Sequence, residues 1–461
     1  MKKCGNCGCE IKYDSARFCP ECGTKLEELK VYDENEFYSK SRIVNNEFRT
    51  YVGDDDEVIV PGSVKVLKFE SFVNNHKSIT LSSGVEVIEV KAIRSNTLKK
   101  IYISDTVKKI EPNAFGILYD NSCSSYFGCC ELEEIVVDEN NPYYKSIDGN
   151  LYSKDGKVLI RVAPGKKEDV IYIPEGVEEV AGSASLYFTT SKKVVLPSTF
   201  GSQDQFLLLL PYFDTEKNLS IELEINKYNP NYKVVDQVVY SKDGKTLSMY
   251  NPSKKDNSFI IPNIVKLIDD CAFHGASLLE YVIIPNGVEE IGEAAFEGCE
   301  SLTSVVIPNS VKTIGSAAFC DCYKLDNISL PNGFKTIPSH VFSGCGITNL
   351  IIPSTIEKID DYAFENCGYL TEVVIPSNVK TIGIGAFSEC YELELVTLNE
   401  GLEVIDKYAF ASSNIKNIRI PRSVNKIGVE AFDGCPQLEK IMVPKGKKFE
   451  NFPKDVSVKE Y

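Results

Sequence analysis

The chain is 461 residues long, which exceeds one ordinary globular domain, and 43% of its residues are hydrophobic, enough to fill a long, narrow core. Its 50 Lys and Arg against 66 Asp and Glu give a formal net charge of −16. That charge argues against a general grip on nucleic-acid backbones, because such affinity comes mainly from basic side chains. No stretch approaches the roughly 18 apolar residues of a membrane-spanning helix, so no membrane span is expected.

The amino-terminal residues hold the clearest chemical motif, the pairs Cys4-Gly-Asn-Cys7 and Cys19-Pro-Glu-Cys22 with eleven residues between them. Four thiolates on two tight turns suit a tetrahedral zinc ion, and a glycine follows the second cysteine of each pair. Sulfur fills all four positions, so no place remains for water and the ion would be structural. A module this small cannot build its own core, so the metal would supply about 10 kcal/mol of its folding energy.

The segment FCPECGTKL resembles the second knuckle of small zinc-ribbon modules, so we interpret residues 1–26 as a zinc ribbon holding one Zn²⁺. A thioredoxin-like redox pair would need only one CxxC, and two at this spacing favour zinc. Cys9 is a bystander or exchanges with Cys7 as a ligand. Many zinc ribbons serve transcription or translation, which makes nucleic-acid binding an alternative. Against it, residues 1–30 carry six basic and five acidic residues and no basic-aromatic cluster.

Residues 27–45 are polar and charged with little periodicity, and we interpret them as a linker that contains at most a short helix. The amino terminus has no apolar run of about seven residues, as a secretory signal would need. Cysteine placement also fits a reducing compartment better than a disulfide framework. We therefore expect a cytoplasmic protein.

From residue 46 a repeat organises the chain, and its clearest copy is LTSVVIPNSVKTIGSAAFCDCYKL at Leu302 to Leu325. A phenylalanine recurs every 22 or 23 residues, and a proline that ends an apolar run keeps the same interval. The phenylalanines are Phe273, Phe296, Phe319, Phe342, Phe364, Phe387, Phe410 and Phe432. Self-similarity with a period of about 20 to 29 residues indicates a solenoid, whose coils bury their apolar side against their neighbours.

Within one unit, Leu302, Val305 and Ile307 have the spacing of a short strand, and Pro308 ends it because proline donates no ladder hydrogen bond. A second short extended piece follows the corner, and Phe319 then places its ring inside the coil. Stacked coils would lie about 4.8 Å apart, the spacing of hydrogen-bonded strands. Equivalent side chains of successive coils should therefore form ladders.

The unit Ile-Pro-x-x-Val-x-x-Ile-Gly-x-x-Ala-Phe-x-x-Cys-x-x-Leu resembles the BspA-type class of leucine-rich repeats over roughly residues 46 to 445. The resemblance implies a curved, right-handed solenoid that binds macromolecules, commonly on bacterial surfaces. The expected fold is thus a β-rich leucine-rich-repeat solenoid at 46–461, with parallel strands and coils of about 23 residues, preceded by the zinc ribbon.

Two related inserts interrupt the repeat, NPYYKSIDGNLYSKDGK from Asn141 and NPNYKVVDQVVYSKDGK from Asn229, with an offset of 88 residues. Each contains Asp-Gly between alternating apolar runs, which is a strong turn signal for a hairpin. We predict β-hairpin inserts at about 139–172 and 227–260, and a duplication of 88 residues explains both.

The outward face of the long strands is the first candidate for function. By the period of two, one column of residues there reads Ile283, Val306, Ser329, Ile351 and Val374, and Tyr281 begins the neighbouring column. Exposed apolar residues in a row mark partner sites, so we expect Tyr281, Ile283, Val306, Ile351 and Val374 to contact a partner. The alternative is that Val and Ile merely suit strands.

Two other ladders have structural interpretations. Charges that mostly alternate follow the short strands at Lys266, Glu289, Lys312, Lys335, Glu357, Lys380 and Glu403, and they would set register between coils. A cysteine stands three residues after most of the phenylalanines, and Ala276 and Ser413 replace it in two coils. We interpret this position as one that packs a small residue.

Catalysis finds little support, because the three histidines, His76, His274 and His340, cannot share a site and no catalytic motif occurs. We therefore expect a non-enzymatic scaffold whose concave sheet and hairpins bind a protein, with a structural zinc ribbon in front. The principal alternative is a surface or secreted adhesin, which the family resemblance suggests.

Overall fold

The computed structural model describes residues 2–3, 10–11, 34–44, 47–120, 125–182, 191–201, 221–331 and 333–461. The chain divides into two compact units: unit 1 comprises Met1–Lys166 and Gly182–Thr189, and unit 2 comprises Lys167–Ala181 and Thr190–Tyr461. Near the amino terminus, β1 (Lys2–Lys3) pairs antiparallel with β2 (Glu10–Ile11). The four cysteines predicted to bind zinc lie outside the described residues.

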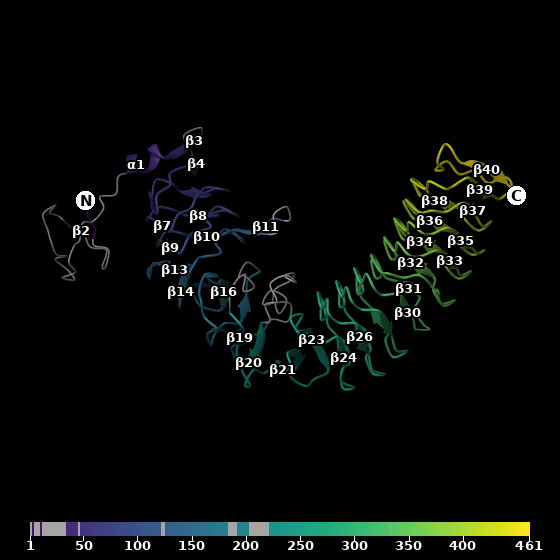
Figure 1. Ribbon diagram of the computed structural model, residues 1–461, viewed down its shortest axis with the longest axis horizontal. Coiled ribbons are helices and arrows are strands. Elements are labelled where there is room, and N and C mark those ends of the chain that lie inside the picture. The colour runs from purple at the N-terminus through teal and green to yellow at the C-terminus, as the bar shows by residue number, and fades with distance from the viewer. Residues whose placement is uncertain are drawn as a thin grey trace. The chain divides into compact units, whose positions relative to one another are not determined.

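Unit 2 is built from coils that each contain a long strand, a corner that usually begins with proline, a short strand and a turn around a phenylalanine (Figure 1). The long strands pair in parallel as β17 (Val170–Tyr172), β19 (Lys193–Leu196) and β20 (Glu222–Ile225); as β24 (Ser258–Ile260), β26 (Tyr281–Ile283), β28 (Ser304–Val306) and β30 (Asn327–Ser329); as β33 (Glu372–Ile375) and β35 (Leu395–Leu398); and as β37 (Asn417–Arg419), β39 (Lys440–Val443) and β40 (Ser457–Glu460).

The short strands form parallel rows of their own. One row is β25 (Leu267–Ile268), β27 (Glu290–Ile291) and β29 (Thr313–Ile314), and the next is β31 (Thr336–Ile337), β32 (Lys358–Ile359), β34 (Thr381–Ile382), β36 (Val404–Ile405) and β38 (Lys426–Ile427). A further short strand is β18 (Glu179–Val180). Alternate residues of a strand enter the core, as in β33, where Val373 and Ile375 are buried while Glu372 and Val374 are exposed. The prediction of a parallel-strand solenoid is confirmed.

A continuous stack of aromatic rings forms the centre of unit 2. Neighbouring rings from Phe273 to Phe432 have centroids 4.7 to 5.8 Å apart and planes inclined by 1° to 24°. Tyr250 extends this stack before Phe273 at 5.2 Å, and Phe452 covers Phe432 at 6.3 Å. Because each coil contributes one buried ring at the same place, the interval in the sequence becomes a column in space.

The turn around each ring is hydrogen-bonded along the stack. In the turn around Phe319, alternate backbone N–H groups donate to the next coil at 2.8 to 3.0 Å, from Ala317 to Ser339, from Phe319 to Val341 and from Asp321 to Ser343. Ala317 and Asp321 have φ values of 55° and 56°, a left-handed backbone that L-residues seldom adopt. The turn therefore continues the ladder that the strands begin.

Unit 1 begins with a cap made of α1 (Glu34–Ser39), β3 (Ser41–Val44) and β4 (Glu47–Tyr51). Phe37 is buried, and its ring lies 5.1 Å from that of Tyr51 and 5.4 Å from that of Phe48. The ammonium group of Lys40 lies 2.8 Å from the carboxylate of Asp55. The second half of the segment that we assigned to the linker at 27–45 is therefore packed on the first coil, because its aromatic residues cover the open end of the core.

The coils of unit 1 follow the same plan. Long strands β5 (Glu57–Val60), β7 (Ser78–Leu81), β9 (Lys100–Ile103) and β13 (Glu134–Val137) form one parallel sheet, and β6 (Val66–Leu67), β8 (Val87–Ile88) and β10 (Lys109–Ile110) form another. Parallel bridges join Tyr51, Phe72, Ile93 and Phe115 in the aromatic position. After these coils, β11 (Ile117–Asp120) pairs antiparallel with β12 (Ser125–Gly128).

Each insert contains three antiparallel strands, where we expected the two strands of a hairpin. They are β14 (Tyr144–Ile147), β15 (Asn150–Ser153) and β16 (Val158–Arg161) in unit 1, and β21 (Tyr232–Val235), β22 (Val238–Ser241) and β23 (Thr246–Tyr250) in unit 2. In the second insert, β23 also pairs in parallel with β25. The insert is therefore part of the coil stack, because the strand after the Asp-Gly turn supplies a short strand to the solenoid.

A buried asparagine begins each of the two inserts. The amide of Asn141 donates to the carbonyls of Ser104 and Val107 at 2.8 and 2.9 Å, and its carbonyl accepts two backbone N–H groups. Asn229 has the same arrangement, with its amide 2.7 Å from the carbonyl oxygen of Phe200. Each side chain thus satisfies backbone groups of two neighbouring coils.

The carboxyl-terminal residues close the other end of unit 2. Strand β40 pairs in parallel with β39, and Phe449 and Phe452 pack beside Phe432. The hydroxyl of Tyr461 donates to the carbonyl of Ile420 at 2.8 Å, and the guanidinium of Arg419 lies 3.8 Å from the centre of the Tyr461 ring. The charged tail therefore caps the core.

Candidate partner-binding site

The long-strand face of unit 2, defined here as the outward side chains of β24, β26, β28, β30, β33, β35, β37 and β39 and of residues 349–351, carries the residues that the sequence singled out. Inward Val282 and Val305 are 5% and 2% exposed. The outward side chains are far more open, with Tyr281 51%, Ile283 57%, Val306 72%, Ile351 83% and Val374 53% exposed. All five predicted residues therefore lie at the surface on one face of the coil stack.

Further exposed apolar residues lie on the same face. Ile260 of β24 pairs with Ile283 and is also exposed. Leu395 of β35 is exposed as well, and it pairs with Glu372, two residues before Val374. The sequence analysis began the column at Ile283 and so missed Ile260, although the preceding Pro-ended apolar run at 258–262 carried the signal.

A groove of about 890 Å³ lies on the long-strand face over β26, β28 and β30. It brings together three of the predicted residues, Tyr281, Ile283 and Val306. The other lining residues come from the strands and the Pro-Asn corners after them, and they are Val282, Ile284, Pro285, Asn286, Ser304, Ile307, Pro308, Asn309, Ser329, Leu330 and Pro331. Ile351 and Val374 lie on the same face but do not line the groove.

The groove ends where the long-strand ladder is interrupted. Strand β30 is the last strand of its sheet, and the next coil contributes only a single bridge, between Asn349 and Glu372. Before that bridge, the carboxylate of Asp326 accepts the backbone N–H of Thr348 at 3.0 Å and its hydroxyl at 2.6 Å. A side chain thus replaces part of the strand pairing between these coils.

Coils with a Pro-ended strand and a buried aromatic turn occur in both units, and comparison with known families agrees. The model of the BspA type leucine rich repeat region matches residues 42–122, 248–371 and 357–455, together more than half of the chain. The chain belongs to the BspA-type leucine-rich repeat family.

Solved structures of other repeat proteins resemble the chain in part. A leucine-rich repeat protein from Eubacterium ventriosum is 22% identical, with 83% of this chain and 86% of that chain covered and a TM-score of 0.47. A leucine rich cell surface protein from Faecalibacterium prausnitzii is 21% identical over 78% and 92% of the two chains, with a TM-score of 0.40. The T. pallidum leucine rich repeat protein is 26% identical over 44% and 87%, with a TM-score of 0.35. No curated protein matches the chain.

In this BspA-type array the cysteines form a hydrogen-bonded layer. The thiol three residues after each ring donates to the carbonyl of the phenylalanine one coil earlier: Cys299 to Phe273, Cys322 to Phe296, Cys345 to Phe319, Cys367 to Phe342 and Cys390 to Phe364, at 3.1 to 3.2 Å. Burial raises the pKa of the Cys390 thiol to about 12 and that of Cys367 well above its usual range. The thiols therefore remain protonated donors at neutral pH, a role that the sequence analysis missed.

The charged ladder of the short strands forms ion pairs between coils. The ammonium group of Lys312 lies 2.5 Å from the carboxylate of Glu289, and that of Lys335 lies 2.5 Å from Glu357. Lys312 holds the pKa of the Glu289 carboxyl below its ordinary value. These groups are exposed, and water weakens exposed ion pairs, so they favour correct register more than they add stability.

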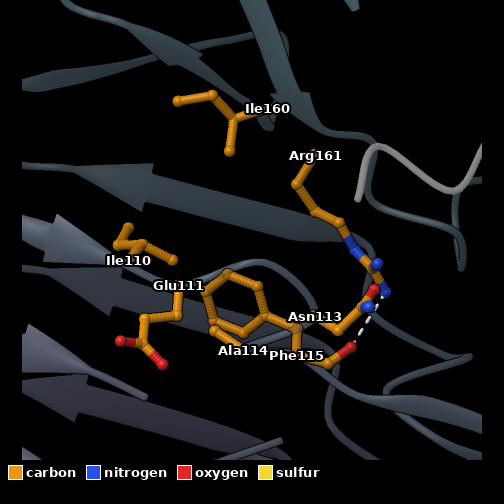
Figure 2. A pocket seen from close by; sticks show the side chains of 7 residues that line it. All are labelled: Ile110, Glu111, Asn113, Ala114, Phe115, Ile160 and Arg161. Carbon is orange, nitrogen blue, oxygen red and sulfur yellow. Dashed lines mark hydrogen bonds between the residues drawn. The ribbon is translucent and has the colours of Figure 1, made fainter. Parts of the chain in front are cut away.

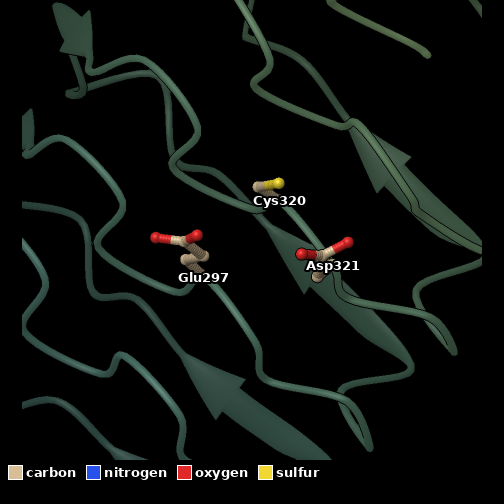
Figure 3. A group of neighbouring side chains, drawn as sticks. All are labelled: Glu297, Cys320 and Asp321. Carbon is tan, nitrogen blue, oxygen red and sulfur yellow. The ribbon is translucent and has the colours of Figure 1, made fainter. Parts of the chain in front are cut away.

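The turns around the rings contain one cluster of titratable groups in unit 2. Carboxylate oxygens of Glu297 and Asp321 and the sulfur of Cys320 lie within 4.8 Å of one another (Figure 3). Burial, with the nearby Asp321 carboxylate, raises the pKa of the Cys320 thiol to about 12. A thiol that keeps its proton is a weak nucleophile.

The histidines occupy three separate environments. His76, in unit 1, lies within 2.7 Å of the carbonyl of Asp55 and packs against aromatic rings. In unit 2, His274 is buried with Nδ1 3.3 Å from a carboxylate oxygen of Glu297, and His340 stacks on Tyr362 at 4.8 Å. His274 and His340 therefore have different partners, and these two do not share a site, as the sequence analysis expected.

Unit 1 contains a small cavity of about 10 Å³ beside Phe115 (Figure 2). Its lining includes Ile110, Glu111 and Ile160, and the buried guanidinium of Arg161 donates to the carbonyl of Phe115 at 3.0 Å. This volume is about that of one water molecule, so the cavity cannot hold a substrate.

Among the described residues, no helix has the length and apolar character needed to cross a membrane.

The long-strand face, with its groove, is the candidate functional site of the described chain. An open face with exposed apolar side chains on a rigid stack suits contact with a macromolecule.

Proposed function

We propose that this BspA-type protein is a non-enzymatic scaffold that binds a protein partner through the long-strand face of unit 2. The observation that carries the proposal is the alignment of Tyr281, Ile283, Val306, Ile351 and Val374, each more than half exposed, on four of five successive coils. The remaining coil has Ser329 in this column. Burying one large apolar side chain contributes about 1.5 to 3 kcal/mol to binding. A partner that covers several of these residues therefore gains most of the binding free energy of a specific interface. Strand preference accounts for Val, Ile and Tyr alike, so the groove beside these residues is the observation that favours a partner.

Affinity capture with the full chain as bait, followed by mass spectrometry, tests the proposal. A bait with Ile351→Asp plus Val374→Asp should lose the captured partner, because two charges would stand on the contact face. The matched control is Ile264→Asp plus Val429→Asp, which places the same charges at positions that are 54% and 48% exposed but lie off the long-strand face. Equal capture by both double variants would refute the proposal.

We also propose that residues 1–26 form a zinc ribbon in which Cys4, Cys7, Cys19 and Cys22 bind one structural Zn²⁺, and that the segment from 27 up to α1 links it to the repeats. The support is the spacing of the two CxxC pairs. Elemental analysis of the purified full chain should find about one zinc per chain, and Cys4→Ser plus Cys19→Ser should remove it. Cys9→Ser is the matched control, and loss of zinc in that variant would assign the site differently.

Membership of the BspA-type family favours one alternative location, the bacterial surface, where such a scaffold would act as an adhesin. We propose that the protein is cytoplasmic, and the cysteine usage of the chain supports this location. Fractionation of cells that carry the native protein distinguishes the two. Recovery of the full chain from the outside of intact cells would support the adhesin.

A further inference from the structure

The groove over β26, β28 and β30 differs from the rest of the chain in its charge. One quarter of all residues are charged, yet none of the fourteen residues that line the groove is Asp, Glu, Lys or Arg. Its floor presents Ile283 and Val306 side by side with Tyr281 in the next column, and its polar groups are neutral amides and hydroxyls. Neighbouring strands lie about 4.8 Å apart, so three strands offer an apolar surface about 10 Å wide.

An uncharged lining restricts what can bind. A charged side chain that entered the groove would lose water and find no opposite charge among the lining residues, which is costly. Nucleic acid is also disfavoured, because its affinity comes from Lys and Arg that neutralise phosphates. The occupant must therefore present apolar and neutral groups to Tyr281, Ile283 and Val306.

The turns that directly precede the three strands of the groove have the opposite character. They are residues 269–278, 292–301 and 315–324, and together they contain six Asp and Glu but only one Lys and no Arg. A surface of one sign attracts partners of the other sign and speeds their encounter, with an effect that salt weakens.

On this basis we propose that the groove binds an uncharged, apolar segment of a protein partner whose flanking residues are basic. The proposal rests on the proposed function, because it assigns to the binding face a place and a partner chemistry. The apolar segment fills the groove and supplies affinity, while the basic flanks lie toward the acidic turns and supply orientation. Exposed apolar residues on the long-strand face would not by themselves require a partner segment that is uncharged or that has basic flanks.

The test uses a phage-displayed library of random twelve-residue peptides selected on the immobilised full chain. Enriched peptides are synthesised with a fluorophore, and Kd is measured by fluorescence anisotropy at low and high salt. We expect a run of uncharged apolar residues flanked by Lys or Arg, with Kd rising as salt is added. Val306→Asp should weaken binding at least ten-fold, and Val306→Lys should weaken it as well, because either charge would be buried without a partner.

Val429→Asp is the matched control, since Val429 is 48% exposed but lies outside the groove and off the long-strand face. It should change Kd less than two-fold. Because Val306 is 72% exposed, its variants should keep the circular dichroism spectrum and melting temperature of the parent, and Val306→Thr provides a strand-compatible substitution if they do not.

Two results would overturn the inference while leaving the proposed function intact: peptides sensitive to Ile351→Asp but not to Val306→Asp, or selected peptides with a charged residue within the apolar run. Peptides whose binding is insensitive to both substitutions would refute both proposals, binding in the groove and binding on the long-strand face. Binding of glycans on an array, with no peptide selected, would show that the groove serves another class of macromolecule.

Discussion

Replacing one ring in the middle of the aromatic stack tests whether the stack holds the coils together. Phe364 is fully buried, and its ring lies 5.6 Å from that of Phe342 and 5.2 Å from that of Phe387. Phe364→Ala removes the ring, leaves a cavity and breaks both ring contacts. Large-to-small changes of this kind cost about 3 to 5 kcal/mol, and each aromatic pair contributes about 0.5 to 1.5 kcal/mol beyond its burial. We therefore expect the free energy of unfolding to fall by about 4 kcal/mol or more.

Urea unfolding followed by circular dichroism measures this loss, and hydrogen exchange shows where it falls. In a repeat array each coil contacts only its neighbours, so amide protection should fall in the coils around residues 342–387 and persist in distant coils. Tyr369→Ala is the matched control, because Tyr369 belongs to the same coil but is 65% exposed. If Phe364→Ala stayed within 1 kcal/mol of the parent chain, or lowered protection evenly along unit 2, the stack would not be the main support of the coils.

Three further predictions concern single side chains. Burial raises the pKa of the Cys390 thiol to about 12, so this thiol should resist iodoacetamide at pH 8 in the native chain and react after denaturation. Peptide mass spectrometry measures the labelling, and labelling of the native chain would contradict a layer of protonated thiols. Burial, offset in part by His340 and reinforced by Glu389, raises the pKa of the Glu365 carboxyl in the folded state, so the native chain holds this proton more tightly and stability falls as pH rises through that value. Glu365→Gln should therefore flatten the decline of melting temperature with pH, and an unchanged slope would refute this. Gly383→Ala should cost about 1 to 3 kcal/mol, since its Cβ would meet the backbone N of Asp361 at 2.7 Å; a melting temperature equal to that of the parent would show that the coils can separate locally.

The regular features of the fold could be predicted from the sequence because each coil repeats the same residues in the same environment. The phenylalanine interval predicts the ring stack, and the alternation around Val305 and Val373 predicts which strand residues face inward. A pattern that recurs in every coil reports the average environment of a position. It therefore revealed the exposed column that contains Val306 and Ile351.

Features that depend on one particular neighbour could not be predicted in this way. The groove includes Val306 and excludes Ile351, although both stand in the same column, because the ladder is interrupted after β30 and Asp326 replaces part of the pairing. The third strand of the second insert joins the coil stack through pairing between β23 and β25, which no local turn signal encodes. Cysteine was predicted to pack as a small residue, but its donation to the preceding coil depends on the position of a backbone carbonyl.

The cysteine layer has a consequence for recovering this protein from the unfolded state. Each of these thiols is needed in its reduced form, because oxidation to a disulfide or a sulfenic acid removes the hydrogen that reaches the neighbouring carbonyl. Once unfolded, the same thiols become accessible and their acidity returns to normal. Renaturation in air should then compete with random crosslinking between the exposed thiols. The yield of native chain will therefore depend on a reductant, although the buried cysteine layer of the folded chain needs none.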